Sequence, residues 1–265
     1  MEFEIYKEFD MKEYALPIKE TIHKCKELIP FTNVKTNTID LKDSNALKIY
    51  NECLFKILEG LIIDIPPGNL IPTAGLHRGV VDIICKEISP SKIIEIGTGC
   101  TAVLAMLFAK RNIDIHATEI SLRSYKHANR LIKQNNLESK INLHLSTGGI
   151  LDWLSNIDNV FPVDLVISFP PYYSEGSQFE SRKSNSFSGV SSELYSSGSA
   201  ESFSINIMKE AFNLQDKVKY FSILWKNSYA LQRGLSFSPI KDCSTKIFKI
   251  KVGNRFRYLS ITKNH

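Results

Sequence analysis

Hydrophobic residues recur with two different periods along the chain from Arg78 onward. Short apolar runs typical of buried strands lie at 92–96, 113–118, 141–145, 163–167 and 218–225. Apolar positions recur at helical spacing over 79–88, 101–110, 121–135 and 205–213. Strands that alternate with helices of this length predict a parallel, doubly wound sheet.

The C-terminal part of the pattern departs from a purely parallel sheet. Two apolar stretches, 245–251 and 255–262, flank Val252-Gly253-Asn254, which is a strong hairpin signal. We therefore expect an α/β, Rossmann-like fold whose sheet is mostly parallel and carries an antiparallel C-terminal strand.

The first 75 residues lack the strand pattern of a parallel sheet. Apolar positions recur at helical spacing from Asp43 to Gly60, and Gly60 suits the end of a helix. The segment from Ile63 to Gly68 is rich in turn residues. We therefore predict a small, helical N-terminal module, 1–75, followed by the main domain, 76–265.

Residues 174–204 contain many serines, several glycines and little periodicity. A loop of that length inside a compact domain is usually a functional lid or a disordered insert. We predict a lid.

Composition narrows the class of protein only a little. The 265 residues are 43% hydrophobic, which is enough for one large α/β domain. The net charge of +5 gives a mild bias toward polyanions, although a lysine-rich solvated surface explains it equally well. No apolar run reaches about 18 residues, so we expect no membrane span.

Cysteine usage favours a reducing compartment. The odd number of cysteines, the absence of a CxxC pair and the absence of a signal peptide argue against disulfides and bound metal. We therefore expect a cytoplasmic protein, and we favour a monomer. The five cysteines are Cys25, Cys53, Cys85, Cys100 and Cys243.

The loop after the first predicted strand has the composition of a nucleotide-binding turn. It runs Glu95-Ile-Gly97-Thr98-Gly99, and its glycines allow a tight turn and a close approach of the backbone to a ligand. Glu119 ends the next predicted strand, twenty residues after Gly99, where a carboxylate can accept both hydroxyls of a ribose. NAD sites and S-adenosylmethionine (SAM) sites share these features.

Two observations favour SAM. Ala102 occupies the place of the third glycine of a pyrophosphate turn, and the C-terminal hairpin suits a methyltransferase sheet. His77 and Arg78 precede the first helix of the main domain, where a cation can hold the carboxylate of SAM. A surface arginine is the alternative interpretation of Arg78.

The fourth predicted strand ends in Ser168-Phe169-Pro170-Pro171-Tyr172, at the sheet edge where α/β ligands bind. The two prolines fix the turn, so a backbone carbonyl can accept a hydrogen bond from an exocyclic amine. Tyr172 or the tyrosine after it can stack on a flat base, which is worth about 1–3 kcal/mol. A flipped or single-stranded base is the natural ligand, because duplex stacking blocks access.

Several short segments, taken with these two turns, match the motifs of a known family. They are Ile39-Asp-Leu41, Ile63-Asp-Ile-Pro66, Leu70-Ile-Pro-Thr73, Ala117-Thr-Glu119, Asn135-Asn-Leu137, Ser188 to Tyr195, and Gly253-Asn-Arg-Phe-Arg257. From about Thr38 to Thr262 the chain resembles the bacterial 23S ribosomal RNA adenine-N6 methyltransferases. It is equally similar in these motifs to the eukaryotic methyltransferase-like-16 group, which methylates U6 small nuclear RNA.

The resemblance implies a SAM-dependent methyltransferase fold with an N-terminal RNA-binding module. It implies SAM as methyl donor, and the N6 amine of an adenosine in structured RNA as acceptor. Phe169, Pro170, Pro171 and Tyr172 would frame the adenine. The residues implied to hold SAM are Arg78, in preference to His77, with Glu95, Gly97, Thr98, Gly99, Glu119 and Ser168.

Phe169 departs from the family motif, which is Asn-Pro-Pro-Phe. The asparagine oxygen accepts one amine proton, and a phenyl ring cannot. An amine left unpaired costs roughly 1–3 kcal/mol, and a misplaced acceptor costs on the order of 10²-fold in rate. Ser168 could replace the asparagine if the strand shifted register.

Other functions remain open at this point. The chain could be a SAM-retaining RNA-binding protein without catalysis, or a methyltransferase for another acceptor that needs no asparagine. An NAD oxidoreductase is a more distant alternative.

Overall fold

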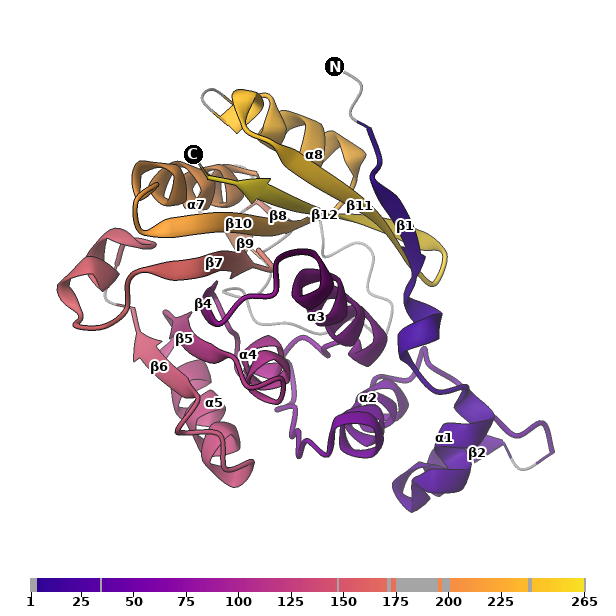
Figure 1. Ribbon diagram of the computed structural model, residues 1–265. Coiled ribbons are helices and arrows are strands. Elements are labelled where there is room, and N and C mark those ends of the chain that lie inside the picture. Colours follow the sequence, from indigo (N-terminus) through magenta and orange to yellow (C-terminus); the bar gives the residue numbers. More distant parts are fainter. Residues whose placement is uncertain are drawn as a thin grey trace.

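The computed structural model describes residues 4–33, 35–146, 148–170, 173–174, 195–196, 201–237 and 240–264. Its centre is an eight-stranded sheet with the strand order β1-β11-β12-β10-β7-β4-β5-β6 (Figure 1). The strands are β1 (Lys7–Asp10), β4 (Lys92–Ile96), β5 (Asp114–Glu119), β6 (Ile141–Leu145), β7 (Val163–Ser168), β10 (Val218–Trp225), β11 (Thr245–Val252) and β12 (Arg255–Lys263). Two small ribbons pair β2 (Thr32–Asn33) with β3 (Thr38–Ile39), and β8 (Tyr173–Ser174) with β9 (Tyr195–Ser196).

The register of the central strands aligns their carboxyl ends. The strands β10, β7, β4, β5 and β6 are parallel, whereas β12 is antiparallel to both β10 and β11. Ser168 on β7 lies opposite Ile96 on β4 and Ile223 on β10, and Ile96 lies opposite Thr118 on β5. The loops that follow β4, β5 and β7 therefore start side by side at one edge of the sheet.

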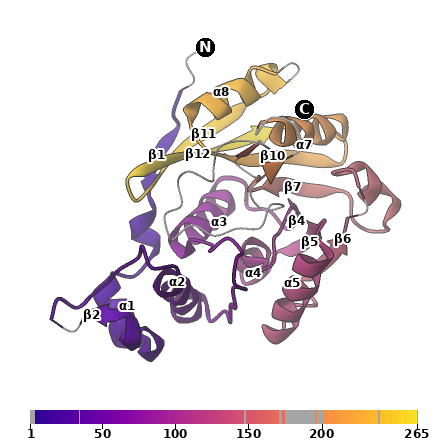
Figure 2. The ribbon, with the colours of Figure 1, turned by 180° about the vertical axis from the view of Figure 1, so that it is seen from behind.

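Helices cover both faces of the sheet, with α2 to α5 on one face and α7 and α8 on the other (Figures 1 and 2). The helices are α1 (Ile18–Lys24), α2 (Ser44–Glu59), α3 (Ala74–Ile88), α4 (Val103–Ala109), α5 (Leu122–Gln134), α7 (Ser202–Asn213) and α8 (Ser228–Leu235). Short 3₁₀ turns are η1 (Met11–Tyr14), η2 (Lys26–Phe31), η3 (Asp152–Asn156) and η5 (Ile240–Asp242). Within the described residues, no helix has the length and apolarity needed to cross a bilayer.

The predicted fold class is confirmed, because the sheet is mostly parallel and the C-terminal strand, β12, runs antiparallel to both of its neighbours. The bounds of β6 and β10 are those predicted from the apolar runs. The helix α3 begins at Ala74 rather than 79, and α8 was not predicted. In the predicted lid, α7 already begins at Ser202, and 175–194 and 197–200 lie outside the described residues.

The N-terminal segment joins the main sheet, which its sequence did not indicate. β1 pairs in parallel with β11, and ion pairs from Lys249 to Glu8 and from Lys251 to Asp10 accompany the pairing. Phe9 packs against the main core. The domain boundary at residue 75 stays a prediction.

Part of the N-terminal segment has a small core of its own. Cys25, Leu28, Ile39, Ala46 and Cys53 are buried together between η2, β3 and α2. The expectation of no disulfide is wrong, because Cys25 and Cys53 are bonded to each other. Separated by 28 residues, they come together because helix α2 packs on the preceding turns, which the spacing of the cysteines alone does not reveal.

The start of α3 is seated tightly on η1. A Cβ built on Gly79 would lie 2.4 Å from the sulfur of Met11, and one on Gly75 would lie 2.6 Å from the Met11 carbonyl oxygen. Glycine is therefore needed at position 75, where a Cβ would meet backbone, whereas at position 79 the flexible end of the Met11 side chain would have to move aside.

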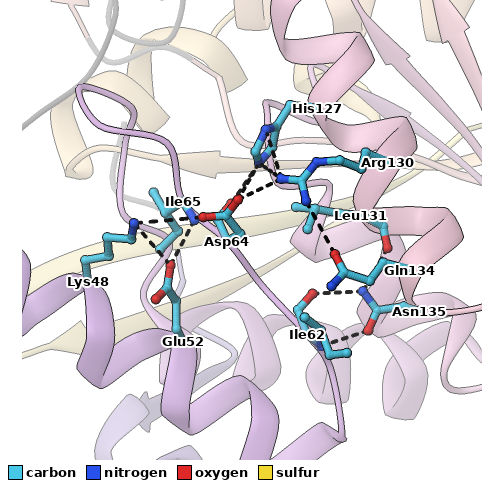
Figure 3. Close-up of polar contacts among 10 residues, drawn as sticks. All are labelled: Lys48, Glu52, Ile62, Asp64, Ile65, His127, Arg130, Leu131, Gln134 and Asn135. Atoms are coloured by element: carbon cyan, nitrogen blue, oxygen red, sulfur yellow. Dashed lines mark hydrogen bonds and ion pairs between the residues drawn. The ribbon is translucent and has the colours of Figure 1, made fainter. Parts of the chain in front are cut away.

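The segment that links α2 to α3 is clasped by α5 (Figure 3). The Asn135 amide group donates to the Ile62 carbonyl and accepts from the Ile62 backbone N–H, each at 2.8 Å. Next to it, Arg130 bonds the Asp64 carboxylate at 2.7 Å, and His127 bonds the Asp64 carbonyl at 2.8 Å. Two motif segments, 63–66 and 135–137, thus lie next to each other. Their contacts hold the segment that leads into α3 in one position.

We expect Asn135→Ala to lower the free energy of unfolding by about 1–3 kcal/mol, because the Ile62 backbone groups lose two partners. Urea denaturation measures this change. The control is Gln134→Ala, which removes only a 3.5 Å contact with Arg130 on the exposed side of α5. Equal stability of the two variants would show that the clasp contributes nothing.

Candidate active site at the carboxyl edge of the sheet

The turn after β4 is anchored on one side and open on the other. The N–H groups of Gly97 and Thr98 both donate to the Thr118 carbonyl, at 3.1 and 2.9 Å. Gly97 and Gly99 have φ angles of +73° and +71°, and a Cβ built on either meets nothing within 4 Å. A ligand can therefore approach the backbone of this turn closely, which is the fit that a bound nucleotide requires.

Glu95, on β4, stabilises the turn through a side-chain hydrogen bond. Its carboxylate is buried and accepts a hydrogen bond from the Thr98 hydroxyl at 2.8 Å. Burial raises the pKa of Glu95 to about 7, against the lowering effect of the Thr98 bond. The nearby charge of Glu119 adds to the rise. This carboxyl group therefore keeps its proton to a higher pH than a free glutamate, and its bond to Thr98 supports the shape of the turn.

Glu119 lies at the end of β5 and closes the turn. One carboxylate oxygen accepts from the Gly99 N–H at 3.0 Å, and the other accepts from the Ser121 N–H at 2.7 Å. A carboxylate offers about four lone-pair sites, so a group of this kind can accept ribose hydroxyls as well as backbone N–H groups. Ile120, which follows it, is 67% exposed and offers an apolar surface beside that position. The sequence prediction missed Ile120, although its place directly after the acidic residue was available as a signal.

The end of β7 supplies the opposite wall. Ser168 is buried and donates its hydroxyl to the Ile96 carbonyl at 2.9 Å, which links β7 to β4. Its register with Ile96 and Ile223 leaves no shift that would put the hydroxyl in the place of the motif asparagine. Phe169 is partly buried against the main core, and Pro170 is buried. The predicted acceptor residues Pro171 and Tyr172 lie outside the described residues.

The Arg78 guanidinium forms an ion pair with Glu59 on α2. Its Nε donates to Glu59 at 2.5 Å, and another nitrogen donates to the Tyr14 carbonyl. Arg111 bonds the same Glu59 carboxylate at 2.9 Å and Asp82 at 3.1 Å. Although burial opposes it, these two guanidiniums lower the pKa of Glu59. The role of Arg78 as a SAM carboxylate ligand stays a prediction, and in this arrangement it would require a change of partner.

His77 points to a different neighbour. Its ring lies 5.1 Å from the Phe169 ring and 6.5 Å from the Phe55 ring, between centroids. Nδ1 lies 2.9 Å from the Thr73 carbonyl oxygen. The surrounding protein lowers the pKa of His77 to about 4, so the ring is neutral at physiological pH. The structure therefore brings His77, rather than Arg78, to the end of β7.

A basic rim lies at the same edge of the sheet. The antiparallel register pairs Tyr258 with Trp225, so the start of β12 extends beyond the end of β10. Lys226 lies at that point, and burial and then the charges of Arg257 and Arg255 lower its pKa. Phe256 is 39% exposed between these arginines. We call Lys226 and residues 255–257 the basic rim.

A family model described as RNA methyltransferase matches residues 13–247. A putative methyltransferase of Methanocaldococcus jannaschii is 32% identical over 232 residues, covering 83% of this chain and 87% of that protein. The ribosomal RNA large subunit methyltransferase F of Pseudoalteromonas translucida is 24% identical, covering 79% and 76%. The RNA N(6)-adenosine-methyltransferase mettl16 of Danio rerio is 25% identical over 77% of this chain, which spans only 45% of that protein.

Solved structures share the fold. The human METTL16 catalytic domain in complex with the MAT2A 3′UTR hairpin 1 has a TM-score of 0.83 at 20% identity, covering 96% of this chain and 93% of that one. The N-terminal domain of human METTL16 in complex with SAH has a TM-score of 0.77 at 19% identity, covering 96% of both chains.

The raised pKa of Glu95 gives a test of its burial. Between about pH 4.5, its ordinary value, and about pH 7, unfolded Glu95 is ionised while the folded residue keeps its proton. Stability contributed by this group therefore falls as pH rises through that range. Relative to Glu95→Gln, wild-type protein should lose on the order of 1–3 kcal/mol between about pH 5 and 8.

Urea denaturation at a series of pH values measures the difference between the two proteins. His77 and His116, whose pKa values burial lowers to about 4, act in the opposite direction but are common to both proteins. A difference that does not change with pH would contradict the assignment.

Proposed function

The chain belongs to the RNA methyltransferase family, and from that membership we propose that it methylates the N6 amine of an adenosine in a structured RNA. It is a SAM-dependent enzyme, as the family and the SAH-bound relative indicate. The observation that carries the proposal is the alignment of the β4, β5 and β7 ends. In this alignment the Gly97–Gly99 turn follows β4 beside the Phe169-Pro170 segment that follows β7.

Bound SAM supplies a methyl group on a positively charged sulfur, which an amine lone pair can attack. Gly97, Thr98 and Gly99 would lie along SAM with their backbone, and Glu119 would accept its ribose hydroxyls. Glu95 acts indirectly, because it holds Thr98 and therefore the shape of the turn. These roles follow from the open face of the turn and from the position of Glu119 at the end of β5.

Methylation of an adenine amine is mainly a problem of positioning. A new N–C bond forms at N6, the methyl–sulfur bond breaks with its electrons kept by sulfur, and one N6 proton is released. The end of β7 fixes where the base can lie, since Ser168 ties this strand to β4 and Pro170 is buried. Holding the amine in line with the methyl group supplies much of the rate enhancement.

Three observations support RNA as the acceptor. One human relative is solved with an RNA hairpin. The chain carries a net charge of +5. The basic rim lies at the site's own edge of the sheet and combines three cations with an exposed phenyl ring, which suits phosphates and unstacked bases.

Transfer of labelled methyl groups from SAM to total RNA tests the proposal. The RNA comes from a host lacking the protein, and nucleoside mass spectrometry identifies the product. N6-methyladenosine is the expected product. A different methylated nucleoside would show that the methyl acceptor is not the N6 amine of adenosine. SAM binding without methyl transfer would favour the alternative that Phe169 motivates, an RNA-binding protein without catalysis.

We expect Gly97→Arg to weaken SAM binding at least about 100-fold, because the new side chain fills the open face of the turn. Isothermal titration calorimetry measures the affinity. Gly60→Arg is the matched control, since Gly60 also has a positive φ of +64° and open space around it, but caps α2. Equal SAM affinity of both variants would show that the turn at Gly97 does not contact bound SAM.

Arg255→Ala should weaken RNA binding and reduce the slope of log affinity against log salt by about one. Filter binding of total RNA across a range of salt concentrations measures both. Lys110→Ala is the control, because Lys110 ends α4 and therefore lies toward the opposite edge of the sheet. An unchanged slope for Arg255→Ala would exclude a phosphate contact by this residue.

A further inference from the structure

Phe169 leaves one proton of the target amine without the side-chain acceptor that the family motif supplies. A buried amine proton without an acceptor costs roughly 5- to 150-fold in an equilibrium or a rate. The residues around Phe169 therefore determine whether that cost is incurred.

The imidazole ring of His77 lies against the Phe169 ring. The two rings lie 5.1 Å apart between centroids at a tilt of 44°, although His77 belongs to α3 and Phe169 follows β7. The resemblance to the family aligns a carboxylate-binding arginine with His77 or Arg78. If it falls at His77, the two departures from the family pattern contact each other in this fold.

The hydrogen bonds of His77 determine which ring nitrogen carries the proton. The Thr73 carbonyl oxygen can only accept, so Nδ1, 2.9 Å away, must be the donor. A neutral ring with a proton on Nδ1 has its lone pair on Nε2, which is then an acceptor. Burial favours the neutral ring by lowering the pKa of His77 to about 4. Within the described part of the chain, we find no partner for Nε2.

Other nearby groups are less suited to accept the amine proton. Ser168 is fully buried, and its bond to the Ile96 carbonyl keeps the hydroxyl between β7 and β4, away from a ligand. Arg78 carries only donors and is bonded to Glu59. Glu95 is buried and already accepts from the Thr98 hydroxyl within the turn.

We propose that Nε2 of His77 accepts a hydrogen bond from the exocyclic amine of the target base, in place of the amide oxygen that Phe169 removes. This assignment rests on the proposed function. It makes His77 a catalytic residue that aligns the amine lone pair, with the Phe169 ring as a wall beside it. It also means that His77 does not bind the SAM carboxylate, since a neutral ring whose single N–H is already donated has no donor left.

Two substitutions separate this role from a structural one. In His77→Asn the amide nitrogen takes the place of Nδ1, so the bond to the Thr73 carbonyl can persist while the Nε2 acceptor is lost. In His77→Gln the amide oxygen reaches the place of Nε2, while the bond to Thr73 is lost. An acceptor role and a structural role therefore predict opposite orders of activity.

We expect His77→Asn to slow single-turnover methyl transfer to total RNA by about 10- to 100-fold, with unchanged SAM affinity. We expect His77→Gln to stay within a few-fold of wild type. Phe169→Asn in the His77→Asn background should restore most of the rate, because it returns the acceptor that the family uses. Melting temperatures of all variants, measured alongside, report on folding.

The outcomes distinguish this inference from the proposed function. If wild-type protein yields no N6-methyladenosine, the proposed function fails and this inference fails with it. If the wild type yields that product but His77→Asn is as fast, or is faster than His77→Gln, His77 is not the acceptor and the proposed function stands. If both variants are slow, rescue by Phe169→Asn supports the acceptor role, and absence of rescue overturns it.

Discussion

The carboxyl edge of the sheet depends on how the chain turns after β4. Gly97 and Thr98 both donate to the Thr118 carbonyl, and Glu119, the next residue, accepts from Gly99. The end of β5 therefore holds the turn at both of its ends, while Ser168 fastens β7 to the last residue of β4. A turn fixed in this way presents its open side without first having to be ordered, which lowers the entropic cost of binding a ligand.

The central strands could be predicted because they are buried on both faces and are therefore almost continuously apolar. The pattern failed at β1, where three of four residues, Lys7, Glu8 and Asp10, are charged. This strand exists because β11 offers it an edge and two lysines to pair with, and neither is visible within its own sequence. The disulfide was missed for a related reason, since it depends on packing between α2 and the turns before it.

In the candidate site, the positions of Gly97, Gly99 and Glu119 followed from strand ends, which sequence patterns locate well. The choice between His77 and Arg78 did not follow. Adjacent residues on a helix point about 100° apart. The apolar spacing of α3 shows which face is buried, but not which of these two residues reaches the end of β7. Glu59 on α2, which binds Arg78, is not visible in the sequence of α3.

The pairing of β1 with β11 also bears on the order in which the protein can be completed during synthesis. Glu8 and Lys249 are separated by 241 residues, so β1 cannot make the pairing seen here until the β11–β12 hairpin has left the ribosome. Until then the β1–β11 pairing cannot hold η1, which follows β1 directly, against α3. Contacts between residues so far apart in the sequence form late, because the entropic cost of loop closure grows with loop length. The helix that carries His77 therefore reaches its final position only after residues 245–252 have been synthesised, and a chain truncated before β11 would lack that support.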